Sequence, residues 1–354
     1  MPKVTTAGRA TKSRRPRVRQ RPWWARLSDE ELLDLRFCDL GLSVPGSRLE
    51  PYVDRLYREL DARGLRCRPH CWVAEEWFSP DGVPGIAVPF YLLHPRLMRL
   101  ERRMMHEVEG GNVNWLMRIL RHEAGHAVDT AYRLRRRRAW RDVFGPASLP
   151  YPRSYRPRPG SRRFVQHLGA WYAQSHPTED FAETFAVWLR PGARWRHDYI
   201  GWPALAKLQC VQSLMADLRN VAPLVRSRMH IEPLADDRCS LREHYRRKIE
   251  RYRDVGVLAI DARIARICGA SGPGDVRAAT LLRRMRRRLR ARVAEAAGAS
   301  QYEVHQALRD VVARCDALGV VVRGDRRLAA RRFERLLTRL VGDRHRGAGP
   351  RLPV

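Results

Sequence analysis

This 354-residue sequence has little lysine, no regular spacing of its cysteines and no long apolar segment. Its seven cysteines are scattered, and an odd, unpatterned set favours a reducing compartment over a disulfide framework. No apolar run approaches the roughly 18 residues of a membrane span. The basic N-terminus also lacks the apolar stretch of a signal peptide. We therefore expect a cytoplasmic protein with no membrane partner.

Acidic residues are heavily outnumbered, which gives a formal net charge of +31 and a pI near 11.2. Only four of the 69 basic residues are lysine, so arginine supplies the charge. Such a skew is typical of a GC-rich genome, and part of the basicity can be compositional. A protein this basic nevertheless attracts polyanions without any specific site.

Charge and chain breaks divide the sequence into three parts. Residues 1–26 carry nine basic residues and no acid, which predicts a disordered basic arm over 1–27. The capping box of Ser28 and Glu31 predicts the start of a folded domain over 28–270. The S-G-P-G break precedes a basic helical extension over 271–354. The arm and the extension are the candidate parts for non-specific binding of nucleic acid.

The sequence of the folded domain predicts a predominantly helical α+β fold with a small sheet. Alternating apolar residues after the S-P-D-G turn predict a strand through Leu92, and Pro89 favours an edge position for it. An extended peptide could pair with such an edge. The irregular segment 145–163 is long for a loop, and such loops either line a site or are disordered. Helices are predicted at 51–62, 115–134, 164–175 and from Thr178 to the Pro191-Gly192 break.

The stretch R-H-E-A-G-H-A-V-D-T at 121–130 carries the strongest chemical signal. On a helix His122 and His126 lie on one face, so both imidazoles can reach one metal ion, with Glu123 beside it. The same pattern occurs by chance on surface helices. Here the helix has apolar residues on two sides, so it is buried, and buried polar side chains need partners. Asp129 either supports a ligand histidine or pairs with Arg133 at i+4.

A third ligand is expected in the stretch S-H-P-T-E-D-F-A-E-T-F-A-V-W-L. On a helix Glu179 and Glu183 share one face, which can pack against the two histidines. A solvated acidic face is the alternative, but the flanking residues are apolar. One glutamate would bind the metal and the other would accept the N–H of a ligand histidine. The spacing does not decide which glutamate has which role. His176 is a weaker candidate, since Pro177 places it before the helix.

These motifs also carry a family resemblance. H-E-A-G-H-A-V-D and the downstream E-D-F-A-E-T-F, with Tyr172 before the first glutamate, resemble the gluzincin metallopeptidases of the anthrax lethal factor and Pro-Pro endopeptidase kind. More closely, residues 28–253 resemble a bacterial family of zinc-binding metallopeptidases, whose frequent N-terminal zinc ribbon is absent here. The resemblance implies a zincin-like core, Glu179 as the third Zn²⁺ ligand, Glu183 as a partner of a ligand histidine, and Tyr172 as donor to the oxyanion.

The expected activity is zinc-dependent hydrolysis of a peptide or protein substrate. Zinc-bound water would attack a carbonyl carbon, with Glu123 as general base. The alternative is a nucleic-acid-binding protein with a structural or secondary zinc site. A protease recruited to nucleic acid would combine the two readings.

Overall fold

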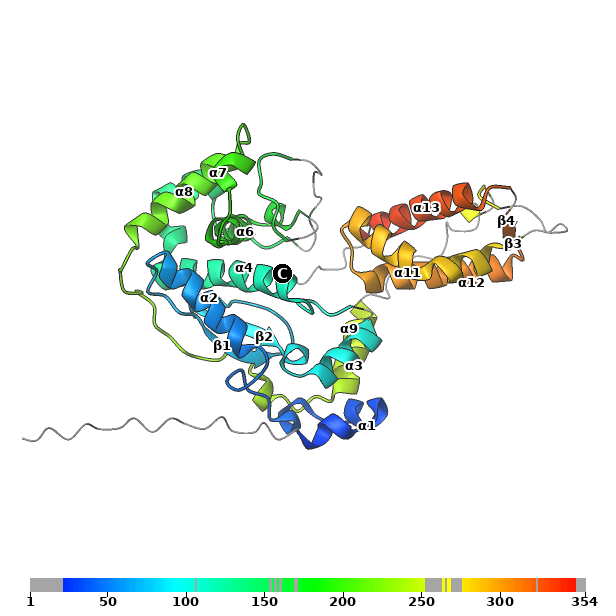
Figure 1. The fold of residues 1–354 in the computed structure, drawn as a ribbon, viewed down its shortest axis with the longest axis horizontal. Coiled ribbons are helices and arrows are strands. Elements are labelled where there is room, and N and C mark those ends of the chain that lie inside the picture. Colours follow the sequence, from blue (N-terminus) through cyan, green and yellow to red (C-terminus); the bar gives the residue numbers. More distant parts are fainter. Residues whose placement is uncertain are drawn as a thin grey trace, which may run out of the picture.

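Helices dominate the computed structural model, and two short sheets supply its strands. This is the helical α+β fold with a small sheet that we predicted. Figure 1 shows most helices around the first sheet, while a bundle of three helices extends to one side. The structure describes residues 22–105, 107–152, 155, 158, 161–168, 171–251, 263–264, 266–268, 276–322 and 324–347.

The elements follow one another along the chain with short connections in most places. The 3₁₀ helices are η1 (Trp23–Arg26), η2 (Phe37–Leu40), η3 (Phe90–Leu93), η4 (Leu134–Arg136), η5 (Tyr172–Gln174) and η6 (Leu234–Asp236). The strands are β1 (His70–Ala74), β2 (Gly85–Pro89), β3 (Val276–Arg277) and β4 (Val321–Val322). The α-helices are α1 (Asp29–Leu33), α2 (Glu50–Ala62), α3 (Pro95–Met105), α4 (Val113–Tyr132), α5 (Arg138–Phe144), α6 (Pro177–Leu189), α7 (Trp195–Asp198), α8 (Ala204–Asp217), α9 (Leu241–Arg251), α11 (Ala278–Ala297), α12 (Gln301–Ala317) and α13 (Arg326–Gly347).

Local sequence signals explain where several helices begin. The Ser28 hydroxyl and the Glu31 carboxylate cap each other's backbone N–H groups at the start of α1, as the capping box predicted. The Asn112 side chain accepts the Trp115 N–H at 2.9 Å and so caps α4. At its other end α4 stops at Arg133, which adopts a left-handed conformation with φ 52°.

The first sheet differs from our expectation. Strand β2 ends at Pro89 and continues as the 3₁₀ helix η3, so the prediction of a strand through Leu92 was wrong. β1 and β2 are parallel, and every residue of β2 is buried. The other edge of β2 is used at Ala87, whose N–H donates to the Phe78 carbonyl at 2.8 Å. A peptide therefore does not find the free edge that we predicted there.

Two further segments also differ from the sequence predictions. The prediction of a disordered arm over 1–27 does not hold for its last residues, because Trp24 is buried and its indole N–H donates to the Leu40 carbonyl. Residues 1–21 lie outside the described part. The described residues of the predicted helix 164–175, which are 164–168 and 171–175, are irregular except for the 3₁₀ turn η5. The reason is that the Leu168 N–H donates to the Glu183 carboxylate rather than to a backbone carbonyl of its own segment.

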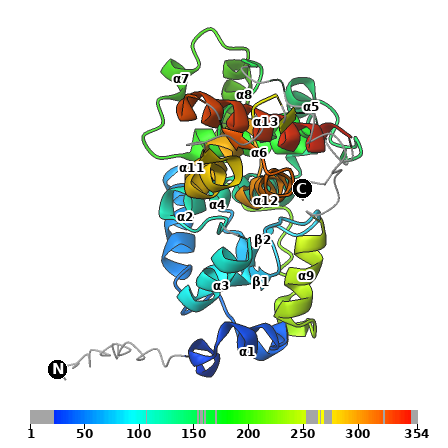
Figure 2. The ribbon, with the colours of Figure 1, turned by 90° about the vertical axis from the view of Figure 1, so that its right-hand side faces the viewer.

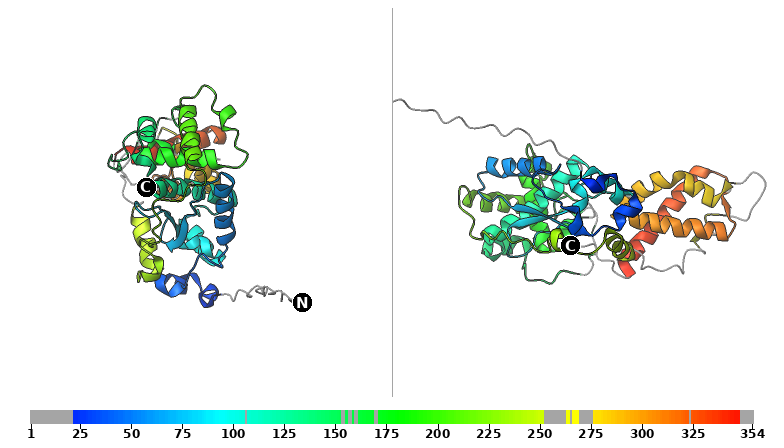
Figure 3. Two further views of the ribbon diagram at one scale, coloured as in Figure 1. Left: turned by 90° about the vertical axis from the view of Figure 1, so that its left-hand side faces the viewer. Right: turned by 90° about the horizontal axis from the view of Figure 1, so that it is seen from below.

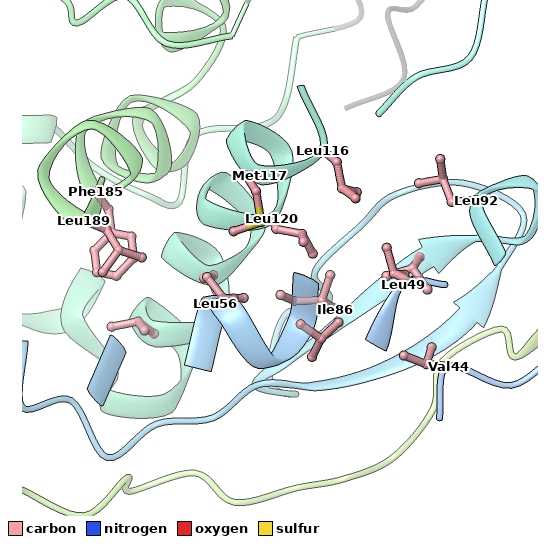
Figure 4. Close-up of a cluster of buried hydrophobic side chains, with 14 of the residues drawn as sticks. Val44, Leu49, Leu56, Ile86, Leu92, Leu116, Met117, Leu120, Phe185 and Leu189 are labelled. Carbon is pink, nitrogen blue, oxygen red and sulfur yellow. The ribbon is translucent and has the colours of Figure 1, made fainter. Parts of the chain in front are cut away.

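One hydrophobic core holds α4 in place between the sheet and α6. Figure 4 shows Leu56 of α2 and Ile86 of β2 facing Leu120 of α4 from one side, and Phe185 of α6 on the other. These side chains are fully buried. Since each fully buried large apolar side chain contributes about 1.5–3 kcal/mol, this packing fixes α4 and α6 against each other.

The three helices α11, α12 and α13 have a hydrophobic core of their own. Figures 2 and 3 show this bundle standing beside the larger body, with one end toward α4 and α6. At that end Tyr302 is buried in the core of the larger body, and the Gln301 N–H donates to the Glu107 carboxylate at 3.2 Å. The bundle is thus built separately but docked through the α11–α12 turn.

Among the described helices, none has both the length and the apolar character that crossing a lipid bilayer would require.

Candidate metal centre

The centre is built first on α4. His122 and His126 are one turn apart on this helix, and their rings stand edge to face with centroids 4.9 Å apart. His122 is 2% exposed, so its polar atoms depend on partners within the protein. The helix is buried along most of its length, as its two apolar sides predicted.

Helix α6 brings the carboxylates. His176 accepts from the Thr178 N–H as the N-cap of α6, and Pro177 follows as the first helical residue. His176 therefore serves the helix end, with its other ring nitrogen 2.9 Å from the Leu149 carbonyl. Glu179 and Glu183, one turn apart, both point toward His122 of α4.

Three ligand atoms converge between the two helices. Oε2 of Glu179 lies 3.0 Å from Nε2 of His122 and 3.1 Å from Nε2 of His126. The two imidazole Nε2 atoms are 3.2 Å apart. Within the described residues this is the one group of histidine, cysteine or acidic side chains so arranged. The structure brings together the three residues that we predicted as ligands.

Glu183 contacts the imidazole nitrogen of His122 that does not belong to the cluster. Nδ1 of His122 is 2.9 Å from Oε1 of Glu183, and the other carboxylate oxygen accepts the Leu168 N–H at 2.8 Å. With Nδ1–H donating to Glu183, the lone pair of Nε2 is directed at the three-atom cluster. This is the arrangement in which an outer carboxylate fixes the tautomer of a metal-binding histidine.

The close approach of the two helices depends on Gly125. A Cβ at this position would lie 2.8 Å from Cα of Ala182 on α6 and 3.2 Å from its carbonyl oxygen. Any larger side chain would hold the helices apart. The glycine between the two histidines is therefore what lets the carboxylates of α6 reach them.

The donor set fits Zn²⁺. Ligand atoms about 2.0–2.2 Å from zinc in tetrahedral geometry lie about 3.3–3.6 Å from one another. The observed separations of 3.0–3.2 Å are a few tenths of an ångström shorter. Two histidines and one carboxylate are a ligand set typical of catalytic zinc, which keeps a further coordination position open. Residues His122, His126 and Glu179 can therefore hold the ion with small adjustments.

Charge is balanced within the cluster. Burial alone would lower the pKa of His122, but hydrogen bonds to Glu179 and Glu183 raise it well above its ordinary value. Burial opposes ionisation of Glu179, yet His126 and His122 hold its pKa well below the ordinary value. A cationic group belongs between these side chains, whether it is a proton or a metal ion.

Glu123 is held by a residue that the sequence did not point to. The Ser79 hydroxyl donates to Oε2 of Glu123 at 2.8 Å, and it also lies 3.2 Å from the Glu123 backbone carbonyl. Ser79 belongs to the S-P-D-G segment, in which the sequence indicated only a turn. Its contact with α4 exists because the loop between β1 and β2 packs over that helix.

Three tyrosines surround the cluster. The ring of Tyr172 is 5.6 Å from that of His122, and burial together with Glu179 and Glu123 raises the pKa of Tyr172 well above its ordinary value. The ring of Tyr155 is 6.5 Å from that of Tyr172. Tyr172 therefore keeps its phenolic proton and can act as a hydrogen-bond donor.

Tyr151 is the second residue that the sequence did not single out. Its hydroxyl donates to Oε1 of Glu179 at 3.0 Å and contacts the Thr178 hydroxyl, while its ring stacks on His176 with centroids 3.9 Å apart. The Pro- and Arg-rich segment 145–163 therefore lines the site at this point, one of the two roles expected for it.

Asp129 is engaged by a residue further along the chain. Its two oxygens accept from the backbone N–H of Arg135 at 2.8 Å and from Nε of Arg135 at 2.7 Å. Arg135 also pairs with Asp81. Arg133, the partner expected at i+4, instead caps the end of α4. Asp129 thus fixes the chain that follows α4.

A cavity of about 1170 Å³ opens onto the cluster. Its walls come from α4, the loop after β1, the segment before α4, and the α11–α12 end of the bundle. Glu109 faces this space, and its enclosure by surrounding protein raises its pKa to about 7. Burial likewise raises the pKa of Glu107 to about 7. The negative charge of the cavity therefore changes around neutral pH.

Residues 100–192, about a quarter of the chain, match the model of a family described as "Putative zinc-binding metallo-peptidase". The match runs from α3 to just past α6 and includes every residue of the three-atom cluster. No curated protein and no solved structure matches the chain. The similarity thus supports zinc binding and a metallopeptidase family over the segment that forms the centre.

Proposed function

We propose that this protein is a zinc-dependent metallopeptidase that hydrolyses peptide bonds. One observation carries the proposal. The Nε2 atoms of His122 and His126 and Oε2 of Glu179 converge at the wall of a large cavity, with Glu123 beside them. The match of residues 100–192 to a zinc-binding metallopeptidase family supports the same conclusion.

Each residue has a distinct task in this reaction. Zinc held by His122, His126 and Glu179 would supply a Lewis acid that polarises a carbonyl group and makes water more acidic. Glu123 takes a proton from the attacking water and passes it to the leaving amine. The hydrogen bond from Ser79 to one oxygen of Glu123 leaves the other oxygen for this proton transfer.

Tyr172 is the proposed donor to the developing oxyanion. Among the described residues its hydroxyl has no hydrogen-bond partner, so its proton is available to a substrate. Tyr151 is a weaker candidate for this role, because its hydroxyl is already committed to Glu179 and Thr178. A preorganised donor of this kind contributes about 2.7–4 kcal/mol to lowering the barrier.

The geometry favours a catalytic over a purely structural zinc. Structural sites usually have four protein ligands. Among the described residues the cluster offers three protein ligands, and all three line the cavity. A structural site would also have no use for a carboxylate such as Glu123 held beside the ligands.

The experiment uses purified protein, metal analysis and a mixture of proteome-derived peptides read by mass spectrometry. Glu123→Gln should retain one zinc per chain and lose hydrolysis, because the amide keeps the size and loses the base. Tyr172→Phe should retain zinc and reduce kcat by about a hundredfold to a thousandfold with little change in KM. The exposed Glu250→Gln on α9 is the matched control and should behave as the parent protein. Full cleavage by Glu123→Gln would refute the mechanism.

A further inference from the structure

The positive charge of the bundle is concentrated on two of its three helices. Helix α11 carries seven arginines and one acid, and residues 326–342 of α13 carry six arginines and one acid. Helix α12, between them in the chain, carries two arginines and three acids. A compositional bias toward arginine acts on every helix alike. The contrast therefore points to a role for the surface that α11 and α13 share.

Helices α11 and α13 run in the same direction. β3 leads directly into α11, and β4 precedes α13 by four residues. Because β3 and β4 pair with each other, both helices begin at the same end of the bundle. Figure 1 shows both running from that end toward the larger body. Arg292 of α11 and Glu334 of α13 form an ion pair at 3.0 Å, which fixes the alignment of the two helices.

This alignment sets two arginines of α11 at the same levels as two arginines of α13. One turn back from the ion pair lie Arg288 on α11 and Arg331 on α13, and two turns back lie Arg284 and Arg327. All four are exposed. Steps of three or four residues keep each pair on the same side of its helix and about 4.5–6 Å from the next. We call these four residues the arginine array.

In the described part of the chain, the guanidinium groups of the array have no carboxylate partner, although the Asp325 carboxylate accepts the backbone N–H of Arg327. Within the described residues none of its four members forms an ion pair, whereas Arg283, on the side of α11 toward α12, pairs with Asp316. Nearby, burial and the charges of Arg286 and Arg287 lower the pKa of Arg290. Like charges at these spacings destabilise a helix. An anionic partner would remove this repulsion.

We propose that the arginine array binds the phosphate backbone of duplex DNA. Guanidinium groups match phosphate oxygens with two parallel hydrogen bonds, and an exposed array on two parallel helices can engage several phosphates at once. Single-stranded nucleic acid is instead held by stacking on aromatic rings. On the described parts of α11 and α13, the aromatic residue is Phe333, which is buried. Duplex phosphates are therefore the better match.

Two further observations limit the partner and the place. A helix that lies on a membrane needs an apolar stripe, and Leu328, 39% exposed, is the single exposed large apolar side chain on the described parts of these two helices. The other end of α11, with Ala291, Ala294 and Glu295, lines the cavity of the metal centre and carries no arginine beyond Arg292. DNA on the array would therefore lie away from that cavity. This proposal does not depend on the peptidase activity.

The test measures binding of full-length protein to a fluorescein-labelled duplex of about 30 base pairs by anisotropy, over a series of salt concentrations. Variant one replaces Arg284, Arg288, Arg327 and Arg331 by Gln. The matched control replaces four exposed arginines of the larger body, Arg99, Arg102, Arg141 and Arg194, by Gln and so has the same net charge. Zinc content and circular dichroism should be unchanged in both.

In the array variant, the negative slope of log K against log salt should become shallower by about 3 to 4, since each lost phosphate contact removes about 0.9 from its magnitude. In the control it should become shallower by less than about 1. Lys at the same four positions should retain most of the slope, because the charge remains. Equal losses in the array variant and the control would show that only net charge matters and would overturn the proposal. Two further results would also overturn it. One is tighter binding of a labelled single strand than of the duplex. The other is an array variant that loses binding to phosphatidylserine vesicles while its binding to DNA persists.

Discussion

Gly125→Ala tests whether the close packing of α4 on α6 creates the metal centre. The new Cβ would start 2.8 Å from Cα of Ala182, while ordinary contacts between carbon atoms are about 3.5–4.0 Å. The clash is with backbone, which cannot rotate away. Helix α6 must therefore retreat by about 1 Å near Ala182. Glu179 is one turn away on the same helix and moves with it.

The size of this movement matters more for zinc than for folding. Overpacking costs about 1–3 kcal/mol, and replacing a helical glycine by alanine recovers about 1 kcal/mol. The net loss of stability is therefore only about 0–2 kcal/mol. Zinc–ligand distances, in contrast, tolerate about 0.2 Å. We expect the zinc affinity of Gly125→Ala to fall tenfold or more, as happens when support of a ligand is lost.

Competition with a chromophoric chelator measures the zinc affinity, and urea unfolding of the zinc-free protein measures stability. Gly125→Ser, with a larger side chain, should weaken zinc binding further. A Gly125→Ala variant that binds zinc as tightly as the parent protein and gains about 1 kcal/mol of stability would refute the reasoning, since helix propensity alone predicts that result.

Three further outcomes are expected. Glu179→Ala should lose zinc, and Glu183→Ala should bind it about 10- to 100-fold more weakly, because one removes a ligand and the other its support; the opposite order in metal analysis would contradict the assignment. Arg121→Ala should lower the free energy of unfolding in urea by about 3 kcal/mol. Glu59 is paired with Arg121 at 2.6 Å, and without it the buried carboxylate keeps only the more exposed Arg55 as a partner. The hydrogen bond from His244 lowers the pKa of Glu75 to about 2 from an ordinary 4.5, so this pair contributes stability that is present above pH 4.5 and is lost as pH falls toward 2. Glu75→Gln should flatten that part of the stability profile, and an unchanged profile would exclude this pair as its source.

Local signals in the sequence were read correctly where a few neighbouring residues decide the structure. The capping box of Ser28 and Glu31 starts α1 as predicted. The spacing of His122 and His126 places both on one face of a buried helix. These features depend on residues within about four positions of one another, so helical geometry alone determines them.

The wrong predictions concern segments whose backbone groups bond to distant parts of the chain. The segment 164–175 has apolar spacing suited to a helix, yet the Leu168 N–H donates to Glu183 and the Gln166 N–H donates to the Tyr199 hydroxyl. Trp171 adopts a left-handed conformation with φ 54°. Tertiary hydrogen bonds replaced the helical ones here, and the sequence of the segment does not show that such partners exist.

The sequence by itself determined the chemistry that is available: two histidines and a glutamate on one helix, two glutamates on another, and arginine in excess. Only the tertiary structure decided how these groups meet. It places Glu179 at Nε2 of His122 and Glu183 at Nδ1, sets Ser79 against Glu123, and docks the α11–α12 turn at the cavity. It also aligns α11 with α13, which turns scattered arginines into an array. The physical reason is that a helix fixes the positions of residues three or four apart, whereas contacts between distant segments depend on how their surfaces pack.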